Sequence, residues 1–441
     1  MTPSGRGTAA GWPAPFLALW MAQTVSSVGT QLSLVAIPML AVFVLHAGPG
    51  EMAVLAALET LPFVILVLPA GVIADAGSRR RLLILSDLGR AAAMATIPVV
   101  FAIGVASFAL LCAVAILVGG FSAMFVVAQQ AYVPELVDEQ RLVKANQRLE
   151  ISDSGARVIG PGAAGFLVQL GGATLAVALD AVSYLASAVA VWFARGGRPV
   201  ETSRRSEPGI RAIVAGVQHV LREPALRLLV TSTAIFNLAA GMTLAQIVLF
   251  ATGDIGLTAA GYGLFQGFGN LGFVVGAVVV DRVERRLGAG AVLAIASVFG
   301  SLAMVLIAAA GLGFGLPALL AGRFMGAVAA PLYNVVLVSV RQARTPDELR
   351  GRVAATFRAV DWGTAPIGAI LSGLIGVAFG LEAVMLVAAA IGLLSLPWVL
   401  VGTVRHISLG SNEEAFIADV RSASSLESLT AVPASLGPGT P

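Results

Sequence analysis

Ionisable side chains inside long apolar runs are the residues of this sequence best suited to chemistry. Glu59, Asp153 and Asp361 place carboxyls in such runs, and Arg323 has no acid within residues 318–330. An intramembrane charge costs roughly 2.5–3.5 kcal/mol on insertion scales, so each must face protein, water or an interface. A carboxyl can carry a proton, and an arginine can bind an anionic or carbonyl-rich molecule. We expect proton coupling at the carboxyls and substrate binding at Arg323; the alternatives are snorkelling for Arg323 and an interfacial position for Glu59.

Uncharged polar residues form a second set of candidates. Gln23, Ser27 and Gln31 recur at helical spacing on one face of an apolar run. Asn237 stands 206 residues after Gln31, and Asn334 follows Arg323 by eleven, again on one face. We expect Gln23, Gln31, Asn237, Arg323 and Asn334 to line a substrate cavity, with hydrogen bonding between helices as the alternative.

Other intramembrane charges occur in local pairs of opposite sign at helical spacing. The pairs are Asp87 with Arg90, Asp153 with Arg157, and Arg358 with Asp361. Such pairs can neutralise themselves. We expect the first to be structural, and Asp180, which stands apart, to be structural as well.

The elements that carry these residues must be membrane helices. Of 441 residues only 12% are charged, against roughly 25% in a soluble protein, and 58% are hydrophobic. A soluble enzyme and a largely disordered chain are both excluded. The lone Cys112 says nothing of redox compartment. Twelve apolar runs reach spanning length; they lie near 15–45, 52–74, 82–104, 107–130, 151–170, 173–194, 225–251, 258–280, 289–310, 315–339, 354–378 and 381–403.

Among the connections between these runs, only alternate ones contain basic residues, which is a complete positive-inside pattern. It places both termini in the cytoplasm and explains the basic balance without nucleic acid. We divide the chain into a cytoplasmic N-terminus (1–14), a six-helix bundle (15–194), a linker with an amphipathic helix (195–224), a second six-helix bundle (225–404) and a disordered cytoplasmic tail (405–441).

An internal repeat relates the two bundles. Asp75 with Arg79 and Arg80 recurs as Asp281 with Arg285 and Arg286, at an offset of 206 residues. The Gly160–Pro161 step recurs as Ala365–Pro366, at an offset of 205. Two matches at nearly one offset predict two homologous halves of six spans each.

These residues resemble the major facilitator superfamily. Gly71, Asp75, Arg79 and Arg80 match its signature Gly-x-x-x-Asp-Arg-x-Gly-Arg-Arg, with Ala76 and Ser78 as departures. The run from Ala156 through Arg157, Gly160, Pro161 and Gly165 resembles its antiporter signature Gly-x-x-x-Gly-Pro-x-x-Gly-Gly, with alanine at 156 and 164.

A narrower resemblance is to the branch of siderophore exporters, macrolide efflux pumps and transmembrane secretion effectors. It is carried by the segments 133–137, 145–146, 157–161, 180–185, 350–353 and 366–368, and it extends over roughly residues 12–405. It implies a fold of twelve transmembrane helices in two pseudo-symmetric six-helix bundles. It also implies a cytoplasmic gate, for which we expect Asp75, Arg79, Arg80, Asp281, Arg352 and Arg358.

The resemblance implies a secondary active transporter in the inner membrane, a monomer that works by alternating access. We expect a proton-coupled exporter of a small amphipathic or hydrophobic molecule, such as a drug, siderophore or secondary metabolite. The first and fourth spans lack the charges of many drug antiporters, so a uniporter or importer stays open, as does a non-transporting membrane sensor.

Three further patterns argue against an enzyme and against a cofactor. Gly267, Gly269 and Gly272 fit a dinucleotide fingerprint but follow no strand, and close helix packing explains them better. The only lysine, Lys144, lacks a phosphate-binding loop, so ATP is not expected as the direct energy source. All three histidines lie outside the apolar runs, which argues against a metalloprotease and predicts no metal.

Overall fold

A computed structural model describes residues 12–76, 78–194 and 210–400, apart from the side chains of 63–64, 67–76, 139 and 210–213. These residues fold into helices joined by short connections, without any strand in the described part of the chain. The first eleven residues of the predicted N-terminus (1–14), the first half of the predicted linker (195–209) and the predicted tail (405–441) lie outside the described residues. Asp75 lies in a described helix, but its side chain does not belong to the described set.

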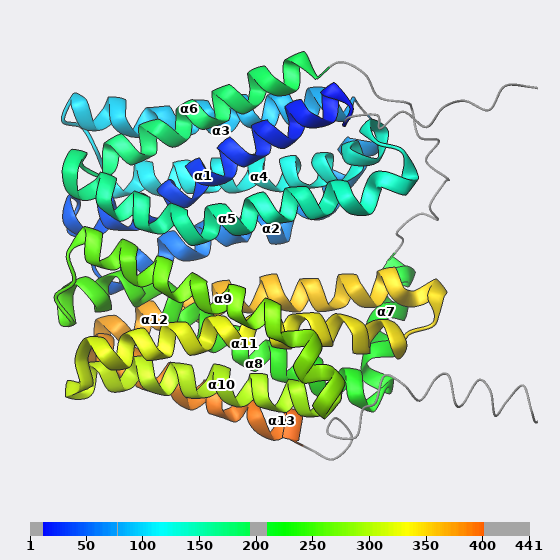
Figure 1. Ribbon diagram of the computed structural model, residues 1–441. Helices are drawn as coiled ribbons and strands as arrows, with labels where there is room; N and C mark the ends of the chain where they lie inside the picture. Colours follow the sequence, from blue (N-terminus) through cyan, green and yellow to red (C-terminus); the bar gives the residue numbers. More distant parts are fainter. Residues whose placement is uncertain (1–11, 77, 195–209, 401–441) are drawn as a thin grey trace, which may run out of the picture.

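The first half of the chain forms six helices (Figure 1). They are α1 (Ala14–Phe43), α2 (Pro49–Ala76), α3 (Arg79–Ala102), α4 (Phe108–Leu136), α5 (Glu139–Gly171) and α6 (Ala173–Phe193). Serine side chains accept hydrogen bonds at the starts of α3 and α4, from the amides of Arg81 and Leu110. A single glycine, Gly172 at φ 81°, turns the chain between α5 and α6.

The second half repeats this arrangement after the short helix α7 (Ile210–Arg222). It contains α8 (Pro224–Leu249), α9 (Ala259–Leu287), α10 (Ala289–Ala309), α11 (Gly315–Ala343), α12 (Arg350–Leu394) and α13 (Leu396–Leu400). Single π-helical turns, Phe250–Asp254 and Ala310–Phe314, extend α8 and α10, and a 3₁₀ turn, Asp347–Leu349, precedes α12. Gly380, at φ 84° and ψ 173°, breaks α12 into two helices. A helix therefore covers each of the twelve predicted runs.

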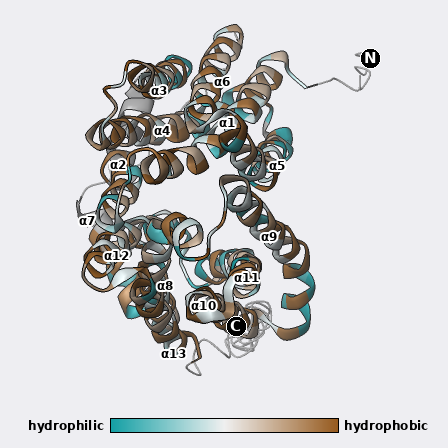
Figure 2. Ribbon diagram, turned by 90° about the vertical axis from the view of Figure 1, so that its left-hand side faces the viewer, coloured by the Kyte–Doolittle hydropathy of each residue, from teal (hydrophilic) through white to brown (hydrophobic). Residues whose placement is uncertain are grey.

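Membrane-spanning character is confirmed for most of this fold. Eight helical stretches are long and apolar enough to cross a bilayer, and two of them, Ala289–Ala343 and Asp347–Leu400, each contain two of the predicted runs. Many large hydrophobic residues are exposed in both bundles, and hydrophobic residues predominate along their helices (Figure 2). The predicted class, an all-α polytopic membrane protein of two six-helix bundles, is correct.

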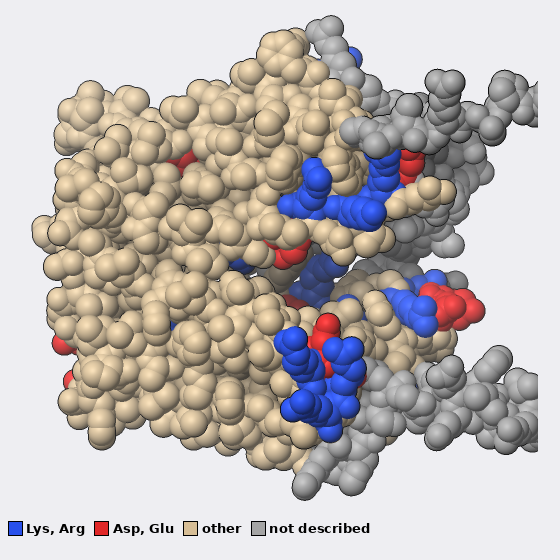
Figure 3. All heavy atoms as spheres, viewed as in Figure 1, with Lys and Arg blue, Asp and Glu red and all other residues tan. Residues whose placement is uncertain are grey.

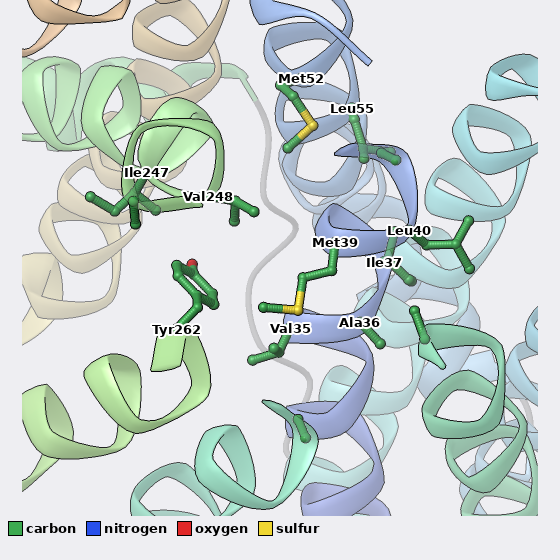
Figure 4. Packing of buried hydrophobic residues seen from close by; sticks show 14 of the residues in the cluster. Val35, Ala36, Ile37, Met39, Leu40, Met52, Leu55, Ile247, Val248 and Tyr262 are labelled. Carbon is green, nitrogen blue, oxygen red and sulfur yellow. The ribbon is translucent and has the colours of Figure 1, made fainter. Parts of the chain in front are cut away.

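The two bundles share a core at one end only, which we call the closed end; it contains the α1–α2 connection, residues 44–48. One buried cluster there joins Met39 and Val35 of α1 to Val248 of α8 and Tyr262 of α9 (Figure 4). At the opposite end, the open end, each bundle has a separate core. Phe16 and Tyr132 belong to one, and the other contains only residues after 219.

Two helix pairs, α2 with α12 and α5 with α9, make most of the contact between the bundles (Figure 2), and α8 adds smaller contacts with α2 and α1. In the second pair the backbones of Gly165 and Gly263 meet. A Cβ on Gly165 would lie 2.5 Å from the carbonyl oxygen of Ala259, and one on Gly263 would lie 2.5 Å from that of Pro161. Only glycine permits this approach.

Candidate substrate cavity

A cavity of about 390 Å³ lies within the N-terminal bundle. α1 contributes Gln23, Ser27, Thr30 and Gln31 to its wall. The remaining wall includes aromatic and charged side chains from α2 to α6, namely Glu59, Arg90, Phe125, Asp153, Arg157 and Tyr184. The polar stripe predicted on α1 therefore faces this cavity, together with two of the predicted carboxyls.

A second cavity, of about 370 Å³, lies within the C-terminal bundle. Asn237 of α8, Asn334 of α11 and Asp361 of α12 line it, together with the rings of Phe236 and Tyr333. Figure 3 shows the surface hollowed between the two bundles toward the open end, with charged side chains beside the hollow.

The two cavities are related by the internal repeat. Ser27 and Gln31 in the first correspond to Thr233 and Asn237 in the second, at the offset of 206 residues. Each wall also contains a threonine and a tyrosine whose hydroxyls form a hydrogen bond, although these two pairs stand at different positions of the repeat. The Thr30 and Tyr184 oxygens are 3.0 Å apart, as are those of Thr233 and Tyr333. The repeat therefore extends from the loops, where the sequence shows it, to the cavity walls.

The charges are distributed differently in the two walls. Asp153 accepts hydrogen bonds from Arg157 at 2.8 Å and from Ser27 at 3.1 Å, so the predicted pair is present at the first cavity. Glu59, in the same wall, forms no ion pair or hydrogen bond within the described part of the chain. An uncompensated carboxyl so placed is a ready acceptor for a proton or a cation.

In the second cavity the carboxyl is held by an amide. Asn237 donates a hydrogen bond to Asp361 at 3.1 Å. The expected Arg358–Asp361 ion pair is absent from the described residues, because the Arg358 guanidinium lies over the Trp362 ring, 5.7 Å from its centroid. The Asp361 carboxyl therefore lines the cavity with an amide, and not an arginine, as its hydrogen-bond partner.

Arg323 occupies a different place from the one expected. Its Nε donates to Gln266 and its terminal nitrogen to Asn270, both at 3.0 Å, across the contact between α11 and α9. It lines neither cavity. Asn270 in turn donates to the backbone oxygen of Arg157 on α5, in the other bundle. Two neutral amides thus satisfy the charge, an arrangement that the spacing of acids along α11 could not show.

The predicted gate residues lie toward the open end, and no ion pair between the described side chains joins the gate residues of one bundle to those of the other. Arg79 pairs with Glu135 of α4 at 2.7 Å, and Arg80 donates to the Val191 oxygen at 3.1 Å and to that of Trp192. Both arginines therefore tie the start of α3 to neighbours in their own bundle. Asp281 is exposed and has no partner among the described residues.

From the resemblance we also expect Asp281 to meet the start of the fifth span near Arg148 or Arg157, and Asp75 to meet the start of the eleventh near Arg352 or Arg358. In the structure these arginines make other contacts. Arg148 stacks over Trp12 and Trp20, and Arg157 pairs with Asp153. The backbone of Arg352 packs against Gly216 of α7. A gate that closes only in another conformation would leave its members apart in this way, so its pairing stays a prediction.

Sequence reasoning missed several buried polar contacts. Gln246 of α8, fully buried, donates to the Pro49 oxygen at 2.9 Å and to Ser372 at 3.0 Å, which joins the bundles at the closed end. Arg90 was expected as structural, yet it also lines the first cavity. Its predicted pair with Asp87 is confirmed, and the guanidinium lies between the Phe125 and Tyr184 rings at 4.2 and 4.3 Å. No periodicity distinguishes these polar residues from others on the same helices.

The fold and the paired cavities define a transporter of the major facilitator superfamily. Several solved structures share the fold over most of this chain. A bacterial homologue of the iron transporter ferroportin in an inward-facing state has a TM-score of 0.70 at 16% identity, covering 89% of this chain and 99% of that one. The nucleoside transporter NupG has a TM-score of 0.69 at 13% identity, covering 89% and 100%.

A family model described as transmembrane secretion effector matches residues 13–417, and the chain belongs to that family. The multidrug efflux pump Tap of Mycolicibacterium fortuitum is 28% identical over 412 residues, which cover 88% of this chain and 94% of that protein. The pump of the same name from Mycobacterium tuberculosis (strain H37Rv) is 27% identical over 430 residues, covering 92% and 94%. The predicted superfamily and branch are confirmed.

Proposed function

We propose that this protein is a proton-coupled exporter of small amphipathic or hydrophobic molecules, working as a monomer by alternating access. The observation that carries the proposal is the pair of cavities, whose walls combine aromatic rings, amides and three carboxyls, Glu59, Asp153 and Asp361. Volumes near 400 Å³ suit drug-sized ligands. The relatives named as multidrug efflux pumps favour export.

The charge distribution supports the direction of transport. Arginines crowd the open end on the visible face of the molecule (Figure 3). Positively charged loops stay in the cytoplasm, so the open end and both termini are cytoplasmic in this proposal. The conformation is then open to the cytoplasm, the state in which an exporter takes up its substrate.

The cavity walls support an amphipathic substrate. Gln31, Asn237 and Asn334 offer amide donors and acceptors, while Phe125 and Phe236 offer apolar ring faces. When the bundles rock together at the open end, Asp75 and Asp281 would meet the starts of α12 and α5. Positive helix ends, together with Arg352 or Arg358 in the first case, would stabilise that closed gate.

Inverted membrane vesicles test the proposal, with the fluorescent cation ethidium as the probe. Acidifying the lumen should drive ethidium inward in vesicles that contain the protein, and nigericin should abolish the accumulation. At least one of Glu59→Gln, Asp153→Asn and Asp361→Asn should lose this accumulation and keep ethidium binding. The matched control is Ser339→Ala, because Ser339 lies near the C-terminal end of α11 and lines neither cavity.

Other outcomes would replace the proposal. Equilibration of ethidium without response to the proton gradient indicates a uniporter. Accumulation driven in the opposite direction indicates an importer, and the absence of any ethidium flux or binding favours a sensor.

A further inference from the structure

A buried cluster behind the wall of the first cavity contains two acids and one base. Asp87 and Asp180 are both fully buried, and Arg90 is 6% exposed. They lie where α1, α3 and α6 pack together. One guanidinium can neutralise only one of two ionised carboxyls, and leaving the other charge unpaired in a bilayer costs several kcal/mol.

The hydrogen bonds show which acid is compensated. The two oxygens of Asp87 are both occupied, one by Arg90 and the other by the Ser187 hydroxyl at 2.7 Å. Asp180 accepts the Ser183 hydroxyl at 3.1 Å on Oδ1, and its Oδ2 has no partner at hydrogen-bond geometry, although the Ser33 and Tyr184 hydroxyls lie close enough to interact with the carboxyl. Asp180 is therefore the carboxyl whose charge is left over.

From this geometry we infer that Asp180 holds the coupling proton, an inference that rests on the proposed function and names a proton site within it. The proton binds the unpartnered Oδ2 and neutralises the second acid, so the cluster carries no net charge while Arg90 stays on Asp87. A metal ion fits poorly, because Ca²⁺ and Mg²⁺ take six or more oxygens. Within the cluster only Asp180 Oδ2 and the buried hydroxyls of Ser33 and Ser86 are unpartnered acceptors.

The residues around Asp180 contain few other charges. α3 contributes Asp87 and Arg90, and Arg90 is close enough to act electrostatically on Asp180. α6 itself contributes Tyr184. α1 has no titratable side chain, and the part of α5 near α6, residues 159–171, has none either. If Asp180 loses its proton, the Arg90 guanidinium is therefore the group that would move toward the charged carboxylate, since its Nε has no hydrogen-bond partner.

Movement of Arg90 would reach the cavity directly. Its guanidinium lies between the Phe125 and Tyr184 rings, and all three residues line the first cavity. The Tyr184 hydroxyl is bonded to Thr30 of α1. Gly29 of α1 also packs against Asp180 and Ser183, so closely that a side chain at position 29 would clash with both. Proton occupancy and the shape of the cavity wall are thus linked through three helices.

Infrared difference spectroscopy of the purified full-length protein tests the inference without any substrate. Between alkaline and acidic buffer, a protonated carboxyl C=O band should appear and should shift when aspartate is isotopically labelled. Asp180→Asn should remove that band, and Asp180→Glu should move it. Ser183→Ala, which deletes the one hydrogen bond to Asp180, should shift its frequency. Glu59→Gln should retain the band.

Specific outcomes overturn the inference. They are an unchanged titrating band in Asp180→Asn, no such band in the wild-type protein, or a carboxylate signal that responds to Na⁺ at constant pH. Monodisperse elution and wild-type helical circular dichroism check the fold of each variant, and Asp180→Glu supplies the reading if the asparagine variant fails to fold.

Transport of ethidium separates this inference from the proposed function. Asp180→Asn should lose accumulation driven by the proton gradient and keep exchange of ethidium at equal pH. Wild-type accumulation in that variant, or loss of both activities in a folded variant, overturns the role of Asp180. If the wild-type protein itself ignores the gradient, the proposed proton coupling fails, and the infrared band still decides whether Asp180 binds a proton.

Discussion

The contact of Arg323 with α9 predicts a loss of stability when the arginine is removed. Its two hydrogen bonds, to Gln266 and Asn270 at 3.0 Å each, lie between helices inside the bundle. Side-chain hydrogen bonds between membrane helices average about 0.6 kcal/mol and reach about 1.7 kcal/mol. A charged donor places these near the upper limit. Arg323→Ala should therefore lower the free energy of unfolding by about 2–3 kcal/mol.

A double-mutant cycle isolates one of the two bonds. Asn270 also binds the Arg157 backbone oxygen, so Asn270→Ala alone loses two contacts. The coupling between Arg323→Ala and Asn270→Ala, measured by equilibrium unfolding in mixed dodecylsulfate and maltoside micelles, should be about 1 kcal/mol. Arg323→Lys should fall between wild type and alanine, because a point charge cannot reproduce two bonds from a planar fork.

Two results would refute this reasoning. One is a coupling below about 0.3 kcal/mol, which is within the additivity of independent sites. The other is weakened ethidium affinity in Arg323→Ala at wild-type stability, which would return Arg323 to the substrate site. Gln266→Leu is the matched control. It removes the hydrogen bond between Arg323 and Gln266, and it should reduce stability without changing the coupling between Arg323 and Asn270.

Three further predictions follow from the interfaces and the cavity. Gly263→Leu should separate α5 from α9 at the closed end and abolish gradient-driven ethidium accumulation in inverted vesicles. Gly261→Ala is the control, because a Cβ there would contact only Thr258 and Leu257, just before the same helix. Unaltered accumulation in Gly263→Leu would contradict the close-packing argument. Asp75→Asn should impair transport at normal membrane abundance, scored by initial rates and immunoblot, and wild-type rates would remove it from the gate. Glu59→Gln should weaken ethidium binding by about tenfold, equivalent to about 1.4 kcal/mol for one uncompensated charge; equal affinity by fluorescence titration would show that this carboxyl does not meet the cation.

The sequence predicts most of the fold because each span is encoded locally. Apolar length defines the helices, and the repeat of Asp75 at Asp281 reveals the two halves. The main difference is in α5, which begins at Glu139 rather than near 151. Its first turns carry charged residues, so hydropathy excludes them, although the helix continues without interruption. Helical propensity and packing on the bundle extend it beyond the apolar run.

The sequence predicts cavity-lining residues where the spacing along one helix determines which way a side chain faces, as for Gln23 and Gln31 on α1. Arg323 shows where this fails. The cost of its charge predicts that a partner exists, but the partner lies on another helix and is an amide, which accepts hydrogen bonds from a guanidinium without carrying the opposite charge. Gln266 and Asn270 lie in a glycine-rich stretch of α9, for which the sequence predicts close helix packing and no binding of a charge. Contacts between helices far apart in sequence leave no periodic signal on either one.

The repeat also indicates how one scaffold can support asymmetric work. Arg90 of the first half corresponds to Ala296 of the second at the offset of 206, and both positions line their cavities. The second wall therefore lacks the guanidinium and its two stacked rings, and its own hydrogen-bonded threonine and tyrosine stand at other positions of the repeat. A carboxyl that gains and loses a proton needs a basic side chain nearby that can respond to its charge. Among the described residues, only the first cavity is lined by arginine. If proton binding acts there, the second bundle need only hold the substrate, through Asn237 and Asp361.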